Sequence, residues 1–279
     1  MLEAQAIRSI RQHVLTGSTE NLKNYLRSRS ADVPVSAPTV NDREVKGPAR
    51  VAACGGALDL RDVPNVDSST VNSVIDTLSS ISKAELENLN LTEFPDVRAA
   101  PWQCCTLLRA ARNRFVSLTQ TFRLPLLQEL DLKNNRLKAL PADFECNNLS
   151  HVDISANMLT SLPAPWVQGK SLQEIRFCYN KISSLDVFTD EFVSKELRVI
   201  DASNNAVCDS SAFERFVETL PNVNTLLLEN NDISKLPAVW GTWESLRTLT
   251  LLGNRLRRPN PTICARGCDA IKAQLRNLL

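Results

Sequence analysis

Five carboxylates recur through the middle of the chain, and their types and spacing suit them to chemistry. They are Glu129, Asp131, Asp153, Glu174 and Asp201. Carboxylates that lie side by side can share a proton, bind a metal ion or attract a cationic group of another molecule. Which of these roles applies depends on the elements that position the side chains.

The carboxylates lie within a repeat frame, Leu-x-x-Leu-x-Leu-x-x-Asn-x-Leu, that recurs seven times. The steps between the frame asparagines are 22, 22, 23, 25, 26 and 23 residues, and these asparagines are Asn113, Asn135, Asn157, Asn180, Asn205, Asn231 and Asn254. A Leu-Pro pair follows three of them, at 140–141, 162–163 and 236–237. Steps of about 20–29 residues are typical of leucine-rich repeats, in which each repeat contributes one strand and one return segment.

The frame predicts how each repeat folds. Residues two apart lie on one face of a strand, so each Leu-x-Leu directs its leucines inward and leaves the intervening side chain outside. Asparagine carries both donors and an acceptor, and a column of asparagines can satisfy the backbone groups where the chain bends after each strand. We therefore predict an α/β solenoid, a leucine-rich repeat horseshoe with a parallel concave sheet and a C-terminal helical cap.

The side chains between the inward leucines should line the concave face. Adjacent parallel strands lie about 4.8 Å apart, so the five carboxylates converge in the middle of that face. The predicted protein-binding residues are Glu129, Asp131, Asp153, Glu174, Arg176, Tyr179, Asp201, Leu227 and Glu229. Acids flanked by apolar side chains suit a partner protein that is basic and partly apolar.

An ordinary solvated face fits the same pattern. Arg109, Lys133 and Arg176 would neutralise part of the acidic charge. Isolated surface charges are weak evidence for a site. Both interpretations of the concave face therefore stay open at this point.

Catalysis and cofactor binding find little support in the sequence. A flat, open strand face offers no closed pocket and no nucleophile paired with a base. No glycine-rich phosphate loop is present. The eight cysteines include no C-x-x-C pair, and only His13 and His151 could join them as metal ligands. We predict no enzyme activity, no catalytic residue, no cofactor and no bound metal.

Composition limits the partners and the compartment. The 279 residues are 43% hydrophobic and 23% charged, and the net charge of +1 gives no reason to expect nucleic acid or an anionic membrane surface. The chain contains no run of about 18 apolar residues, and its first residues lack the apolar stretch of a secretory signal. Reduced cysteines are the simplest expectation. We predict a cytoplasmic monomer.

The chain is expected to divide into five segments. These are a helical cap-like segment at 1–30, a flexible linker at 31–50, an irregular N-terminal cap and partial repeat at 51–100, seven leucine-rich repeats at 101–256 and a C-terminal cap helix at 257–279. The linker is assigned from its prolines and charges. A helix capped by Asp67 or Ser68 is expected in the third segment, and Pro261 should begin the last helix.

Short segments near both ends are the most distinctive parts of the sequence. They are Arg8-Ser-Ile-Arg-Gln, Tyr25-Leu-Arg-Ser, Leu58-Asp-Leu, Leu251-Leu-Gly-Asn-Arg-Leu-Arg-Arg-Pro, Gly267 and Leu275-Arg276. Through them the chain, from residue 8 to 279, resembles the C-terminal half of the leucine-rich-repeat-containing protein 40 family. The resemblance implies a cytoplasmic protein that binds other proteins, without known catalysis. The sequence departs from the family pattern at 91–95, where several residues of a repeat, including its asparagine, are absent.

These observations predict a non-enzymatic scaffold that binds a partner protein on its concave face. Two alternatives remain open. One is a regulatory subunit or adaptor of a phosphatase or ubiquitin ligase, and the other is a binder of a basic protein such as a histone. The salt dependence of binding separates them, because exposed charges are screened at high ionic strength and apolar contacts are not.

Overall fold

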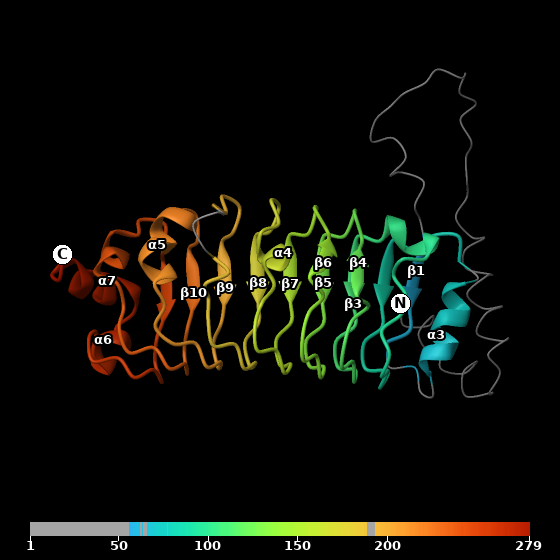
Figure 1. Ribbon diagram of the computed structural model, residues 1–279, viewed down its shortest axis with the longest axis horizontal. Coiled ribbons are helices and arrows are strands. Elements are labelled where there is room, and N and C mark those ends of the chain that lie inside the picture. The colour runs from blue at the N-terminus through green and yellow to red at the C-terminus, as the bar shows by residue number, and fades with distance from the viewer. Residues whose placement is uncertain (1–55, 62, 64–65, 77, 189–192) are drawn as a thin grey trace, which may run out of the picture.

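The computed structural model describes residues 56–279 except 62, 64–65, 77 and 189–192. The predictions of a cap-like segment at 1–30 and of a linker at 31–50 fall outside these residues and stay predictions. The described residues form one elongated solenoid, in which successive coils of chain stack side by side (Figure 1).

A parallel sheet runs the length of the solenoid. Its nine strands are, in spatial order, β1 (Ala57–Asp59), β2 (Lys83–Glu85), β3 (Leu107–Arg109), β5 (Glu129–Asp131), β7 (His151–Asp153), β8 (Glu174–Arg176), β9 (Val199–Asp201), β10 (Thr225–Leu227) and β11 (Thr248–Thr250). The central residue of every strand is buried, and its two neighbours are not. This alternation is what the Leu-x-Leu frame predicts, and it confirms the α/β leucine-rich repeat solenoid.

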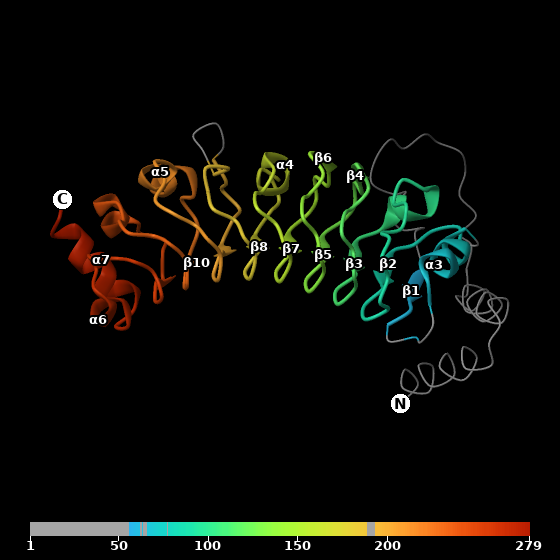
Figure 2. The same cartoon turned by 60° about the horizontal axis from the view of Figure 1, so that its bottom comes forward.

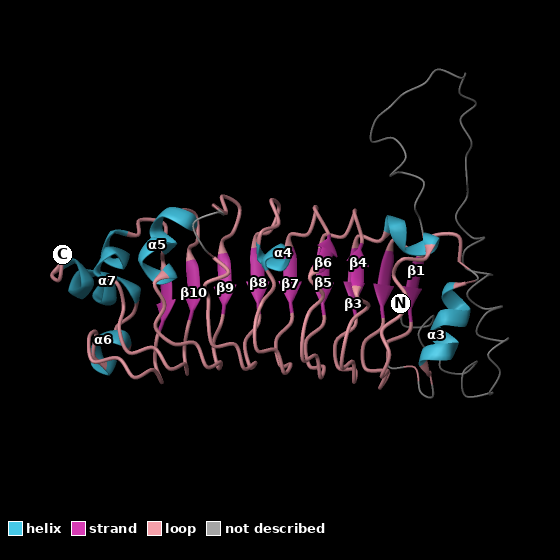
Figure 3. Ribbon diagram, in the orientation of Figure 1, coloured by secondary structure: helices cyan, strands magenta, loops and turns pink. Residues whose placement is uncertain are grey.

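The return segments form the opposite layer. They contain a short second sheet of β4 (Thr121–Arg123) and β6 (Asp143–Glu145), which the sequence did not predict. They also contain the helices η2 (Ala100–Cys104), α4 (Ala164–Val167), α5 (Ala212–Thr219) and η3 (Ala238–Thr242). Figure 2 shows a shallow arc with β4, β6, α4 and α5 on its outer side. The nine-stranded sheet is therefore the concave face, and Figure 3 shows its strands side by side.

Aromatic side chains fill the outer layer. Phe144 stacks on Trp166 with ring centroids 4.0 Å apart. Further along, Trp240 stacks on Phe216 at 5.9 Å, and its Nε1 donates a hydrogen bond of 2.6 Å to the Phe213 carbonyl. All four tryptophans are buried, so their side chains pack inside the layer of return segments.

The frame asparagines form a continuous hydrogen-bonded column. In the middle of it, Asn157 accepts a hydrogen bond from the Leu137 N–H of the preceding coil, and its amide donates to the Ile154 carbonyl of its own coil. All seven residues directly before a frame asparagine have positive φ, as at Asn134 (53°) and Ala156 (52°). The chain reverses through these left-handed residues, so the buried asparagine must satisfy the groups that the bend leaves unpaired.

The N-terminal part of the solenoid is more regular than its sequence suggests. Strands β1 and β2 extend the sheet ahead of the seven predicted repeats. Asn113 Oδ1 accepts from both the Leu89 and Leu91 N–H groups, so it closes a coil that lacks its own frame asparagine. Helix α3 (Ser68–Ile75) has Asp67 as its N-cap, which accepts from the Thr70 N–H at 2.7 Å and confirms the predicted cap.

The C-terminal cap consists of two helices instead of the single helix predicted over 257–279. Helix α6 (Pro261–Cys264) begins at the expected proline, and α7 (Cys268–Arg276) follows after Gly267, whose φ of 90° interrupts the helical backbone. Lys272 is buried in α7, and its Nζ donates to the carbonyls of Trp243 (2.5 Å) and Leu246 (3.2 Å) in the last coil. Those two bonds help to attach the cap to the solenoid, together with the buried Ile271 and Leu275.

Candidate functional site

The strand register brings the predicted acidic residues together. Glu129 pairs with His151 and His151 with Glu174, which gives one row across the concave face. The neighbouring row runs through Asp131, Asp153, Arg176, Asp201 and Leu227. Both rows are those expected from the repeat frame.

A shallow hollow of about 300 Å³ lies among these side chains. It is lined by Glu129, Leu130, Asp131, His151, Val152, Asp153, Glu174 and Arg176. The expectation of a flat strand face is therefore wrong at this point. The strands are short, and the side chains of three of them surround a space large enough for one side chain of another molecule.

Several of the acids are already paired with cations. Arg109 contacts Glu129 at 2.7 Å and Glu85 at 3.4 Å, and Arg176 pairs with Glu174. Glu85 was missed by the sequence reasoning, although it faces Arg109 across the β2–β3 register. Extending the frame by one strand upstream would have found it.

Three aspartates of the second row also serve the backbone. Asp131 accepts from the Lys133 N–H at 3.0 Å, Asp153 from the Ser155 N–H at 3.0 Å and Asp201 from the Ser203 N–H at 3.1 Å. Each bond spans two residues at the end of a strand, where the chain begins its bend. These side chains therefore stabilise the turn after each strand, and they also give the concave face its negative charge.

Asp131 is more buried than its predicted place on an exposed face suggests. Its side chain is 14% exposed, and Lys133 Nζ lies 3.4 Å from it. Burial raises the pKa of Asp131, the Lys133 N–H opposes the rise, and the charge of Asp153 adds to it. Asp153 and Asp201 form no salt bridge within the described part of the chain.

Apolar side chains border the acidic rows toward the C-terminal end. Tyr179, which follows β8, is 63% exposed and has a φ of 55°. Leu252 is 43% exposed, and Leu227 and Glu229 are half-buried. The predicted residues thus share one face, with acids in its middle and apolar groups at its C-terminal side.

Serine and histidine do meet on this face, but not as a nucleophile and its base. Ser150 Oγ lies 2.8 Å from His151 Nδ1 and donates its proton to the Gln128 carbonyl at 2.9 Å. When the hydroxyl donates to that carbonyl, it has no proton left for the imidazole to accept. Among the described residues, no three His, Cys, Asp or Glu side chains gather as metal ligands.

The cysteines depart from the expectation of reduced thiols at one position. Cys104 is disulfide-bonded. Cys105, Cys146, Cys178, Cys208, Cys264 and Cys268 are free. Burial raises the pKa of the Cys105 and Cys146 thiols to about 12, so neither is a reactive thiolate at neutral pH.

Helices of the described segments are all too short or too polar to cross a lipid bilayer.

Comparison with known proteins agrees with this architecture. Residues 126–147 match the leucine-rich repeat family model. The fold is similar to that of a leucine-rich repeat protein of Leptospira interrogans, with a TM-score of 0.54 and 22% identity over 75% of this chain and 57% of the other. It is also similar to the plant peptide hormone receptor RGFR1 in complex with RGF2, with a TM-score of 0.52 and 28% identity over 66% of this chain.

The chain spans only part of both proteins, 57% of the first and 30% of the second. The repeat frame and the parallel sheet of this chain fit the leucine-rich repeat architecture. The chain is a protein of the leucine-rich repeat fold.

Proposed function

We propose that this chain is a non-enzymatic interaction scaffold that binds a basic, partly apolar segment of another protein on its concave face. The observation that carries the proposal is the in-register gathering of acids from β5, β7, β8 and β9 around one hollow. Each acid comes from a different coil, so the arrangement depends on the folded solenoid.

The charges favour a basic side chain in the hollow. Asp153 and Asp201 stand on either side of Arg176 in the strand register and have no ion pair with another described residue. The half-buried Asp131 has lost part of its hydration. A cation of the partner would compensate the free-energy cost of that lost hydration. A lysine or arginine of the partner placed near Asp153 would therefore gain charge-assisted hydrogen bonds.

The apolar border favours a partner that is not purely basic. Tyr179 and Leu252 present exposed apolar surface, and tyrosine is enriched among residues that dominate binding energy. The plant receptor with a similar fold was determined in complex with RGF2, which supports a binding role for this architecture.

The test replaces Asp153 and Asp201 with asparagine. Asparagine keeps the oxygen that accepts the turn N–H, whereas lysine at the same positions would remove it and disturb the fold. Affinity capture from lysate, followed by quantitative mass spectrometry, compares this double variant with wild type at low and high salt. We expect basic proteins captured by wild type at low salt to be lost with the variant.

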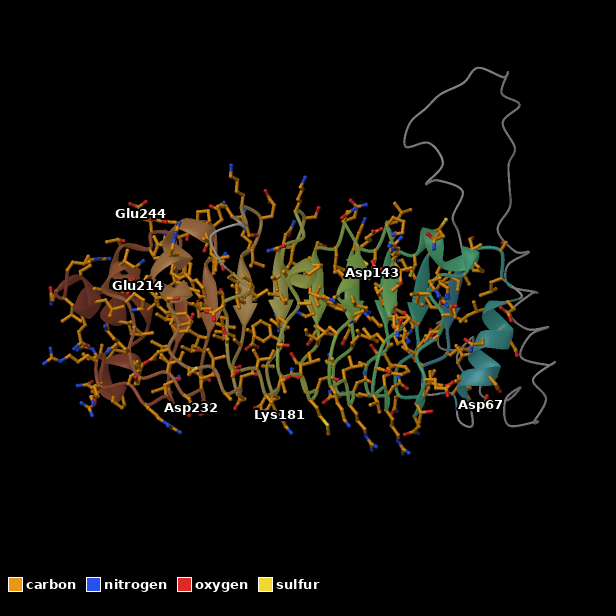
Figure 4. All side chains as sticks on the ribbon, in the orientation of Figure 1. Asp67, Asp143, Lys181, Glu214, Asp232 and Glu244 are labelled. Carbon is orange, nitrogen blue, oxygen red and sulfur yellow. The ribbon has the colours of Figure 1, made fainter. Side chains whose placement is uncertain are left out.

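The matched control is Glu214→Gln with Glu244→Gln, which makes the same change in net charge. Glu214 lies in α5, which Figure 2 shows on the outer side of the arc, and Figure 4 shows Glu244 at the upper edge of the solenoid. The proposal is wrong if the concave variant captures the same basic proteins as wild type, or if the control loses them equally. Salt-resistant capture of a phosphatase or ubiquitin-ligase subunit would favour the adaptor alternative instead, and capture of histones would name the basic partner.

A cytoplasmic location and a monomeric state stay predictions.

A further inference from the structure

A second cavity lies near the C-terminal end of the solenoid, away from the acidic face. Its volume is about 680 Å³, and four of its lining residues are basic. The basic residues are Lys235, Arg255, Arg257 and Arg258. Two leucines, Leu236 and Leu278, add apolar surface to the lining.

The repeat frame places the first of these cations. Arg255 directly follows the frame asparagine Asn254, as Lys181 and Asp232 follow theirs. Figure 4 shows Lys181 and Asp232 along the lower edge of the solenoid. Arg255 pairs with Asp232 at 3.0 Å, so it lies at the same edge. Arg257 and Arg258 come next, between the last coil and α6.

The backbone beside Lys235 is fixed by an aspartate of the preceding coil. Asp209 accepts from the N–H groups of Ser234 at 2.7 Å and Lys235 at 3.1 Å. Two cations of the cavity therefore have an acid nearby, because Arg255 also pairs with Asp232 at 3.0 Å.

The remaining two cations have no such partner. Arg257 and Arg258 are both exposed and form no salt bridge with any residue that the structure describes. The cavity thus holds an excess of positive charge in a chain whose net charge is only +1. Guanidinium groups pair with carboxylates through two parallel hydrogen bonds, so two adjacent arginines suit two neighbouring acids.

Apolar surface distinguishes this cavity from a simple anion site. Leu278, which follows the end of α7, lines it and is 47% exposed. A partner with only charged groups would leave that leucine in water. A peptide that carries an apolar side chain beside its acids would cover it.

We propose that this cavity binds an acidic peptide segment of a partner protein. Carboxylates of the segment pair with Arg257 and Arg258, and an apolar side chain of the segment packs on Leu278. The charge preference is opposite to that proposed for the concave face, so the two surfaces recruit different segments. The protein would then join a basic and an acidic element at two separate places.

The test measures fluorescence anisotropy of a labelled peptide in which glutamates flank two leucines, titrated with the full chain. We expect saturable binding that weakens with salt, because the contacts are ionic. Replacing Arg257 and Arg258 with glutamate should weaken binding at least about tenfold. Replacing them with glutamine should give a smaller loss, and Leu278→Ala should weaken binding at unchanged net charge. Circular dichroism confirms that each variant is folded.

The matched control is Arg114→Glu with Arg136→Glu. Both arginines are exposed and directly follow a frame asparagine, as Arg255 does, but they lie in distant coils. If this control weakens binding as much as the cavity variant, only the overall charge matters and the proposal fails.

Three further results would overturn it. One is equal binding of a peptide with glutamine in place of glutamate. Another is full competition by inorganic phosphate with no effect of Leu278→Ala, which would leave an anion site only. The third is a salt-sensitive dimer in sedimentation velocity that Arg257→Glu with Arg258→Glu abolishes, because the occupant would then be a second copy of the chain.

Discussion

The asparagine column offers the sharpest test of the fold, through Asn157→Ala. The Asn157 amide donates to the carbonyls of Leu132, Ile154 and Ser155, at 3.1, 3.0 and 3.2 Å. Each of these carbonyls has another donor, for example the Asn180 amide at the Ile154 carbonyl. The donors of Asn157 are therefore partly redundant.

Its acceptor is not redundant. The Leu137 N–H donates to Asn157 Oδ1 at 3.0 Å and to no other described group. Alanine would leave that buried N–H unpaired, and an unsatisfied buried group costs about 1–3 kcal/mol. A loss of about 2 kcal/mol lowers the Tm of a domain of this size by about 4–8 °C.

Urea denaturation followed by circular dichroism measures the loss, with the slope of the transition checked for constancy. Met158→Ala is the control, because Met158 is the adjacent residue and is exposed. Asn134 is also exposed, but it is a poorer control. Its backbone is left-handed, so alanine at this position would add strain of its own. Equal midpoints for Asn157→Ala and Met158→Ala would refute the argument.

Two further predictions concern the outer layer and the acidic face. Trp240→Ala should cost about 3–5 kcal/mol, because the ring is fully buried and stacked on Phe216, yet it should leave capture of the concave partner unchanged in the folded fraction. Thermal denaturation and capture at low temperature check both halves, and a cost below about 1 kcal/mol would contradict the packing. Asp131→Asn should change the pH dependence of stability. Burial raises the pKa of Asp131 above its ordinary value of 3.8, so the wild type is relatively most stable below that pH and loses the advantage as pH rises through the folded pKa. The urea midpoint of the variant should therefore rise relative to that of wild type between about pH 3 and neutral pH. If the difference between the two midpoints stays constant or falls over this range, burial is not the cause of the pKa shift.

The sequence predicted the repeat fold well because its physical causes are local. The alternation of leucines fixes which face of each strand is buried. A shift of one residue would turn all the leucines of that strand toward solvent, so the correct register is strongly favoured. The rows through Asp131 and Asp153 followed directly from that register. The asparagine column followed from the need to pair backbone groups at each bend.

Features that depend on several segments at once were missed. The coil of β2 lacks a frame asparagine of its own, and Asn113 of the next coil accepts from its Leu89 and Leu91 N–H groups. The hollow depends on side-chain sizes on three strands, and the basic cavity joins residues from 234 to 278. Strands β4 and β6 pair because two neighbouring return segments are both extended and lie in register with each other.

The asparagine column also gives the solenoid a direction. Every frame asparagine reaches back to accept an N–H of the coil before it, as Asn254 does for Ile233. If a coil peels away at the C-terminal end, the coil left behind has an unpaired N–H. Peeling from the other end also leaves N–H groups unpaired, as at Met158, whose N–H donates to the Leu137 carbonyl of the coil before it. Each end of the solenoid therefore exposes unpaired N–H groups unless a cap covers it, and the buried Lys272 of α7 helps to hold the C-terminal cap against the last coil.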